Sequence, residues 1–352
     1  MTPEAVSGLR PVGVTPLGSA SSMTEPGLDV VGIGNALVDV LSHEDDTFLD
    51  RLGLVKGSMT LVETDRAEEL YRAMASRTEM SGGSAGNTLA GVASFGGRAG
   101  YIGRVHDDEL GTVFAHDLGS LGVHFDSPRA TAGPHTGRCM IVVSADAQRT
   151  MNTYLGASAL LGVEHLDLDM IRDAEVTFLE GYLFDRPEAK EAYRVATSTA
   201  HDAGRKVALT LSDGFCVDRH RDDFVALVDG GVDILFANAD EITRLYAVDS
   251  FEAAVVEVRE HCEIACLTRG AAGSVVVHGQ DEWAIEAHPV DRVVDTTGAG
   301  DLYAAGFLFG YTTGLSLDHA GRLGSMAASA VIGHTGARPG LSLKQLLPTL
   351  ES

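Results

Sequence analysis

The 352-residue chain has few cysteines and no long apolar run. Its four cysteines are too few and too scattered for a disulfide framework: Cys139, Cys216, Cys262 and Cys266. Cys262 and Cys266 have no second ligand pair nearby, and the 13 histidines show no metal-binding spacing, so buried thiols are favoured over a zinc site. No stretch of about 18 apolar residues occurs, and no transmembrane helix is therefore expected.

Basic residues are also scarce, since 26 Lys and Arg face 50 Asp and Glu, for a formal charge of −24. This charge argues against nucleic acid or an anionic membrane as partners. Residues 1–27 are rich in Pro, Gly, Ser and Thr and lack the basic start and apolar core of a signal peptide. We therefore expect a disordered leader, a folded domain over 28–352 and a cytoplasmic location.

Short apolar runs alternate with helical patterns along most of the chain. Strands are predicted at 29–34, 99–102, 176–179, 207–211, 234–237, 264–267 and 274–277. Helices are predicted at 67–76, 84–95, 108–121, 188–203, 218–229, 239–246, 251–261, 302–313, 319–333 and 343–350. This alternation predicts an α/β fold with a parallel sheet covered by helices on both faces.

A predicted hairpin stands outside this alternation, with strands at 136–144 and 149–155. Together with the irregular segment near 41–62, it predicts a small β lid made of segments 41–62 and 130–156. A lid would exclude water from a reacting group. Arg138 and Arg149 lie on the hairpin, where they could bind a phosphate or remain solvated, and the sequence leaves both options open.

The most informative segment is Asp-Thr-Thr-Gly-Ala-Gly-Asp at 295–301, between an apolar run at 290–294 and an apolar helical pattern. It predicts a strand, a glycine-rich turn and a helix N-terminus. Free backbone N–H groups at such a junction, here those of Gly298, Ala299 and Gly300, suit an anion. Asp301 beside them suits a base that takes a proton next to a phosphoryl group in transfer. The alternative is a plain helix cap with a solvated Asp.

A second glycine-rich segment, Gly-Gly-Ser-Ala-Gly-Asn at 82–87, precedes the predicted helix 84–95. It can also be read as the Gly-x-Ser-x-Gly elbow of a hydrolase. We disfavour that interpretation because residues 76–81 are polar and do not predict a buried strand feeding the turn. A triad would also need an Asp and then a His downstream, and His319 and His334 are candidates that nothing in the sequence anchors there.

In this order, the two segments resemble the N-terminal and C-terminal signatures of the PfkB (ribokinase-like) family of ATP-dependent kinases. The resemblance covers the chain after the leader. It implies a three-layer α/β sandwich with a mostly parallel sheet and a small β lid. It also implies phosphoryl transfer from MgATP to an alcohol, with Asp301 as base and Gly298, Ala299 and Gly300 as the anion hole. A non-catalytic relative is disfavoured because Asp301 is present.

The same resemblance assigns the binding residues. Substrate contacts would come from Asn35, Leu37, Asp39, Gly82, Gly83 and Asn87. ATP would be bound by Asn238, Thr268, Arg269, Gly270 and Gly273, unless 268–273 is a simple hairpin turn. Mg²⁺ would be held near Glu241, through water, unless Asn238 and Glu241 only cap a helix. Asp295 and Thr297 match the positions that bind a monovalent cation, commonly K⁺, in the family.

The acceptor is harder to predict. Residues 34–39 and the extended signatures look like those of bacterial adenosine kinases, which implies a purine nucleoside phosphorylated at its 5′-hydroxyl. Leu37 and Tyr182 would then flank the base. The alternative is a sugar kinase for fructose, ribose or a sugar acid, because the same catalytic residues serve both reactions. A homodimer is left open.

Overall fold

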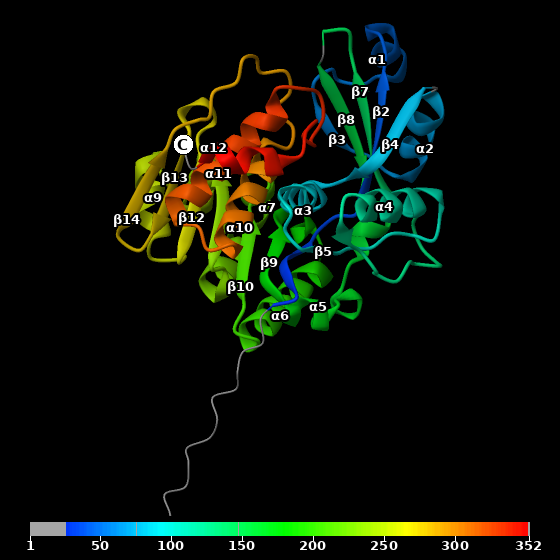
Figure 1. The fold of residues 1–352 in the computed structure, drawn as a ribbon. Coiled ribbons are helices and arrows are strands. Elements are labelled where there is room, and N and C mark those ends of the chain that lie inside the picture. The colour runs from blue at the N-terminus through cyan, green and yellow to red at the C-terminus, as the bar shows by residue number, and fades with distance from the viewer. Residues whose placement is uncertain (1–25, 75, 147, 351–352) are drawn as a thin grey trace, which may run out of the picture.

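The computed structural model describes residues 26–350 except 75 and 147, so most of the predicted leader lies outside the described residues. In the described part, two β-sheets form the framework of the molecule (Figure 1). The larger sheet lies at the centre, and the smaller sheet rises from one end of it. No helix of this part combines the length and the apolar character that crossing a membrane requires.

The larger sheet has nine strands among the described residues, in the order β14-β13-β12-β11-β10-β9-β1-β5-β6. The strands that pair in parallel are β1 (Leu28–Ile33), β5 (Ala99–Ile102), β6 (Val123–His124), β9 (Ala174–Glu180), β10 (Lys206–Thr210), β11 (Ile234–Asn238) and β12 (Ile264–Thr268). At one edge, β13 (Ser274–His278) and β14 (Asp281–Ile285) pair antiparallel. The predicted mostly parallel α/β sheet is therefore confirmed.

Helices cover both faces of this sheet. Successive side chains along each strand point to opposite faces, so each strand packs on both layers of helices. Val30, Phe178 and Phe236 pack with α3 (Ser84–Phe95), α10 (Ala299–Thr312) and α11 (Leu317–Ile332). Val31 and Leu179 pack on the other face, whose helices are α5 (Leu168–Asp173), α6 (Pro187–Asp202), α7 (Gly214–Gly231), α8 (Ala239–Tyr246) and α9 (Phe251–Val258).

Glycines let α3, α10 and α11 approach one another closely. A Cβ on Gly91 of α3 would lie 2.5 Å from Ala305 Cβ of α10. A Cβ on Gly306 of α10 would lie 2.6 Å from the Leu323 carbonyl oxygen of α11. Any side chain at either position would separate the helices. This contact places the first turn of α10 beside the first turn of α3.

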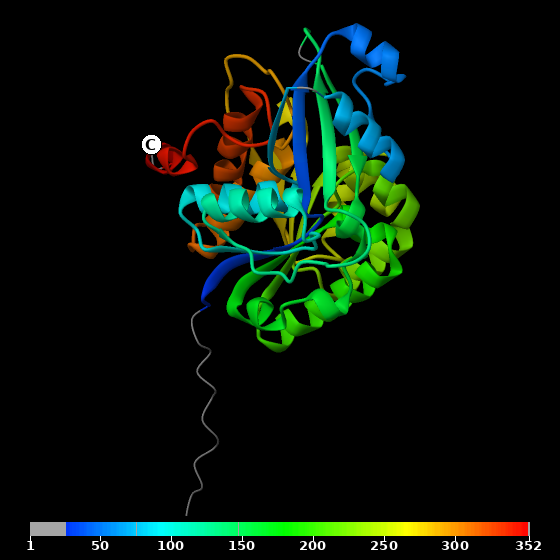
Figure 2. The same ribbon diagram turned by 90° about the vertical axis from the view of Figure 1, so that its right-hand side faces the viewer.

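The smaller sheet has five strands among the described residues, in the order β3-β8-β7-β2-β4. They are β2 (Leu37–His43), β3 (Met59–Leu61), β4 (Arg77–Gly82), β7 (Gly137–Val143) and β8 (Arg149–Tyr154). One face packs on α1 (Asp46–Leu52) and α2 (Thr64–Ala73), which run along its outer side in Figures 1 and 2. The other face carries Cys139, Ile141 and Met151. The remaining helices are α4 (Glu109–Ser120) and α12 (Leu347–Leu350).

Three expectations about individual elements are wrong. Residues 290–294 form a loop rather than a strand, because the Val294 and Asp295 amides donate to the Ile332 carbonyl at the end of α11 instead of to a strand. Residues 77–82 do form a strand, because polar side chains are tolerated on the exposed part of an edge strand. The predicted lid segments contain β3, β7 and β8 but only part of β2, and they omit β4.

Candidate active site

A cavity of about 820 Å³ lies between the smaller sheet and the carboxyl ends of the parallel strands. This end of an open α/β sheet is where ligands commonly bind. Most of the predicted site residues line it, namely Asn35, Leu37, Asp39, Gly83, Asn87, Asn238, Glu241, Thr268, Gly270, Thr297, Gly298, Ala299, Gly300 and Asp301. Among the described residues, no histidine lines this cavity.

Asp301 lies in the first turn of α10 and is half-buried. Its carboxylate accepts a hydrogen bond from Ser84 Oγ at 2.6 Å and one from Asn87 Nδ2 at 3.0 Å. Burial raises the pKa of Asp301 to about 6, and the two hydrogen bonds together with nearby Arg338 limit the rise. The carboxylate is thus fixed in position and suited to accept a proton near neutral pH.

Ser84 therefore serves the carboxylate of α10 rather than a histidine, which removes the hydrolase interpretation on a different ground from the predicted one. A strand does precede the glycines, since β4 leads directly into Gly83 and α3, but only its last two residues, Ser81 and Gly82, are buried. The hydrolase elbow needs a base beside the serine. Here the group beside Ser84 is the Asp301 carboxylate.

The loop before α10 presents backbone amides to the cavity. Gly298 has φ +78°, and a Cβ there would lie 2.7 Å from the Ala337 carbonyl oxygen, so glycine is required. The Ala299 amide donates to the Thr296 carbonyl at 3.2 Å, so this one of the three predicted donors is already engaged. Amides of a helix first turn have no partner within the helix, and Gly300 belongs to that turn.

Asp39 of β2 lines the opposite part of the cavity. Burial raises its pKa to about 6, while Arg338 and Arg149 lower it. Gly82 does not line the cavity. It lies against Asp39, since a Cβ on Gly82 would be 2.4 Å from the Asp39 carboxylate. Gly83 has φ +81°, and a Cβ there would lie 2.3 Å from the Asn35 carbonyl oxygen, so glycine is required at this position.

Asn35 is buried, and its polar groups are already used. Its backbone and side-chain N–H groups donate to Glu180 Oε1 at 3.3 and 2.9 Å, and its Oδ1 accepts from Ser158 Oγ. Glu180 also accepts from the Ala85 amide, and burial raises its pKa to about 7. Asn35 and Glu180 thus tie the end of β1 to the start of α3 beneath the cavity.

Sequence reasoning missed Ser84, Glu180 and Arg338. Ser84 lies inside the glycine signature, and Glu180 ends a predicted strand, so both carried a local signal. Arg338 carried none. It donates to Asn87 Oδ1 at 3.1 Å and to the Ser81 carbonyl at 2.7 Å, and it offsets the charges of Asp39 and Asp301.

On the other side of the cavity, Asn238 and Glu241 form a reciprocal cap of α8. Asn238 Oδ1 accepts from the Glu241 amide at 2.9 Å, and Glu241 accepts from the Asn238 amide at 2.8 Å. Burial first, and then Asp213 and Asp240, raise the pKa of Glu241 to about 7. Since Glu241 and Asp213 both line the cavity, a cation at this point would be stabilised. The donor set fits Mg²⁺ held through water.

Arg269 and Gly273 do not line the cavity, unlike Thr268 and Gly270. The Arg269 guanidinium lies 5.0 Å from the centre of the Phe251 ring, so it is held away from the cavity. Gly273, with φ +81°, has no room for a Cβ, which would lie 2.1 Å from the Ile285 carbonyl oxygen. Glycine is therefore required at position 273 by the geometry of the turn into β13.

Asp295 also lies outside the cavity lining, whereas Thr297 is part of it. Asp295 accepts from the Thr297 and Gly336 amides at 3.0 and 2.9 Å, and Arg149 Nη1 lies 3.0 Å from Asp295 Oδ2. Because Arg149 already supplies a positive charge to this carboxylate, the residues do not fit the predicted monovalent cation. Arg149 is 8% exposed and Arg138 pairs with Glu68, so neither is a solvated strand charge.

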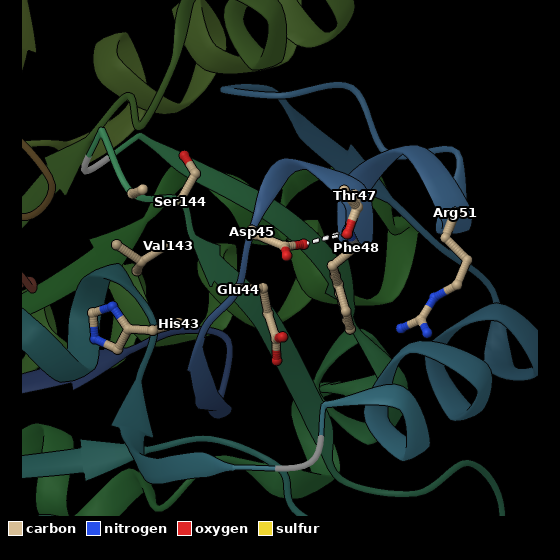
Figure 3. A pocket seen from close by; sticks show the side chains of 9 residues that line it. His43, Glu44, Asp45, Thr47, Phe48, Arg51, Val143 and Ser144 are labelled. Atoms are coloured by element: carbon tan, nitrogen blue, oxygen red, sulfur yellow. Dashed lines mark hydrogen bonds between the residues drawn. The ribbon is translucent and has the colours of Figure 1, made fainter.

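A second hollow, of about 800 Å³, lies at the far end of the smaller sheet (Figure 3). None of the predicted site residues lines it. Asp45 there accepts from Thr47 Oγ1 and from the Phe48 amide, so its carboxylate caps α1. The four cysteines are free, and three of them are buried while Cys262 is half-buried, as expected for thiols in the core. Among the described residues, His106, Asp108 and His135 form a group that could hold a metal ion, and it contains no cysteine.

Comparisons with known proteins place these features in a family. The sequence model of the pfkB family carbohydrate kinases matches residues 49–344. A probable sugar kinase from Rhizobium etli is 46% identical, with 93% of this chain and 99% of that chain covered and a TM-score of 0.86. An adenosine kinase from Sinorhizobium meliloti is 50% identical, with 92% and 99% covered and a TM-score of 0.84. Aminoimidazole riboside kinase from Salmonella typhimurium is 28% identical over 244 residues, 68% of this chain and 76% of that protein.

Proposed function

Since this chain belongs to the pfkB family of carbohydrate kinases and is an ATP-dependent kinase acting on a hydroxyl, we propose that it phosphorylates the 5′-hydroxyl of a purine nucleoside. The observation that carries the proposal is the composition of the sheet face that lines the cavity. The Asp39 carboxylate shares this face of the smaller sheet with an apolar wall made of Leu61, Ile141 and Met151. A ribose hydroxyl pair suits the carboxylate, and a flat base suits the apolar wall.

A free sugar fits this cavity less well, because it carries hydroxyls on every side and each buried hydroxyl needs a partner. Leu37 and Tyr182 also line the cavity, and the Tyr182 hydroxyl is already used by the Ser212 carbonyl. The 50% identity to a protein named adenosine kinase supports the nucleoside. The 46% identity to a protein named sugar kinase supports the alternative, which the experiment below tests.

In the proposed reaction, Asp301 accepts the proton of the 5′-hydroxyl as its oxygen attacks the γ-phosphorus of ATP. A new O–P bond forms, and the bond from the γ-phosphorus to the β–γ bridging oxygen breaks, which releases ADP. The amides at the start of α10 face the charge on the transferring group. Ser84 and Asn87 hold Asp301 in the orientation that this transfer requires.

ATP would lie along the ends of β11 and β12, where Asn238, Thr268 and Gly270 line the cavity. Mg²⁺ would be held through water by Glu241, with Asp213 adding negative charge, and would neutralise the phosphates. The smaller sheet, with the adjoining helices α1 and α2, would act as the lid that excludes water from the transfer.

The direct test is ADP release from MgATP with adenosine, guanosine, inosine, cytidine, ribose, fructose and 2-keto-3-deoxygluconate at matched concentrations. We expect the highest kcat/KM with adenosine. 5′-Deoxyadenosine, which lacks the acceptor hydroxyl, should inhibit without being consumed. Faster turnover with ribose, fructose or the sugar acid than with every nucleoside would overturn the proposal and establish the sugar kinase instead.

A further inference from the structure

Arg149 is the first residue of β8, and Thr153, near the other end of this strand, lines the cavity. Residues 149, 151 and 153 share one face of the strand, because side chains alternate. Met151 and Thr153 of this set line the cavity. Arg149 extends from the same face to Asp295 in the loop before α10, and its side chain is 8% exposed. An ion pair between two largely buried side chains thus joins the smaller sheet to the loop before α10.

The contacts of Asp295 place its carboxylate directly behind the proposed anion hole. It accepts from the Thr297 and Gly336 amides at 3.0 and 2.9 Å, and Arg149 Nη1 lies 3.0 Å from its Oδ2. Thr297 and Gly298, which follow it, line the cavity where the anion hole begins. An uncompensated negative charge there would oppose a transferring phosphoryl group.

We propose that Arg149 replaces the monovalent cation that the family resemblance assigns to Asp295 and Thr297, so that this enzyme needs no K⁺. The positive charge behind the anion hole then comes from the lid and is present only while the lid is closed. Lid closure and readiness for phosphoryl transfer become one event, whereas a dissolved cation would occupy Asp295 in either state. This inference rests on the proposed phosphoryl transfer.

The test compares the wild type with Arg149→Met, which keeps side-chain length but removes the charge. Initial rates are measured in KCl and in choline chloride at equal ionic strength. We expect equal rates for the wild type in both salts. Arg149→Met should be slow in choline and recover about fivefold or more in K⁺, the lower range of typical coupling between two sites.

A second measurement does not depend on turnover. The melting temperature of Arg149→Met without substrates should rise with KCl relative to choline chloride, because a cation that binds only the folded state stabilises it. The wild-type melting temperature should be the same in the two salts. Adding Asp295→Asn to Arg149→Met should remove the K⁺ effect on melting.

Arg138→Met is the matched control, since Arg138 is another buried lid arginine but pairs with Glu68 of α2. It should melt at a lower temperature without gaining a response to K⁺. Arg149→Lys should remain independent of K⁺. Activation of the wild type by K⁺, or an Arg149→Met variant indifferent to K⁺ in both measurements, would overturn the inference. An acceptor other than a nucleoside would change the substrate panel and leave the melting result intact.

Discussion

At the scale of single residues, Asp301 is subject to two opposing effects. Burial raises its pKa to about 6, which strengthens it as a base, while hydrogen bonds from Ser84 and Asn87 favour the ionised form. Arg338 adds a positive charge in the same direction. The result is a carboxylate that is ionised at neutral pH yet close enough to its pKa to accept a proton.

Asp301→Asn should lower kcat by about 10²- to 10⁴-fold, the usual contribution of a positioned base. The amide is nearly the same size, so ATP affinity and the melting temperature should change little. Steady-state rates and ATP titration measure the two effects. Asp281→Asn, on exposed β14, is the control and should leave kcat unchanged. Retained turnover in Asp301→Asn would rule out the proposed mechanism.

The pH dependence should show the same carboxylates. Burial raises the pKa of Asp301 and that of Asp39 each to about 6, and the charge of Asp301 contributes to the rise at Asp39. Because the ionised forms exist above this pKa, kcat/KM should be constant near pH 8 and fall as pH drops through about 6. The apparent pKa belongs to the pair. Circular dichroism at each pH must show a folded protein, and a profile flat down to about pH 5 would contradict the assignment.

At the scale of elements, α8 shows that a capping motif and a binding motif can be the same residues. The helix cap that the sequence offered as the alternative for Asn238 and Glu241 is present, with both reciprocal hydrogen bonds. Both residues nevertheless line the cavity. Capping fixes the two side chains at the carboxyl end of β11, where a ligand would meet them.

Asn238→Ala should therefore weaken both the helix cap and the binding of MgATP, whereas Ser250→Ala should weaken a helix cap alone. Ser250 caps α9 by accepting from the Ala253 amide at 3.1 Å and does not line the cavity. Each substitution should lower the free energy of unfolding by about 1 kcal/mol. Only Asn238→Ala should raise KM for MgATP. Chemical denaturation should show that the two variants are equally destabilised. If they then have the same KM for MgATP, Asn238 serves only as a cap.

At the scale of the whole molecule, the chain combines a rigid sandwich with a smaller sheet whose edge is incompletely covered. Met59 and Leu61 of β3 are 48% and 53% exposed, although both line the cavity. Exposed apolar side chains beside a cavity are the groups that a bound ligand would cover. We therefore expect the β3 edge of the smaller sheet to close over a bound substrate.

Hydrogen exchange provides the test of this closure. Amides of residues 59–61 should exchange more slowly when the acceptor and a non-hydrolysable ATP analogue are both bound, because the edge strand then opens less often. Residues 281–285 of β14, an edge strand of the larger sheet, serve as the internal control, and their exchange rates should not change. Unchanged exchange at 59–61 under confirmed saturation would show that this edge does not close.

The sequence by itself determined the features that depend on neighbouring residues. The alternation of strands and helices and the glycine turn before α10 follow from side-chain period and backbone freedom within a few residues. For this reason the mostly parallel sheet could be predicted, and most of the predicted site residues do line the cavity. Residues 290–294 and β4 could not, because their partners, Ile332 and β2, are distant in sequence.

Only the tertiary structure decided which charges face each other. Ser84 meets Asp301, Arg338 offsets the charges of Asp39 and Asp301, and Arg149 reaches Asp295. These contacts exist because α3 packs on α10 and the smaller sheet folds over the strand ends, and neither event leaves a local pattern. Burial then sets the pKa values, and burial is a property of the whole packed molecule rather than of any segment.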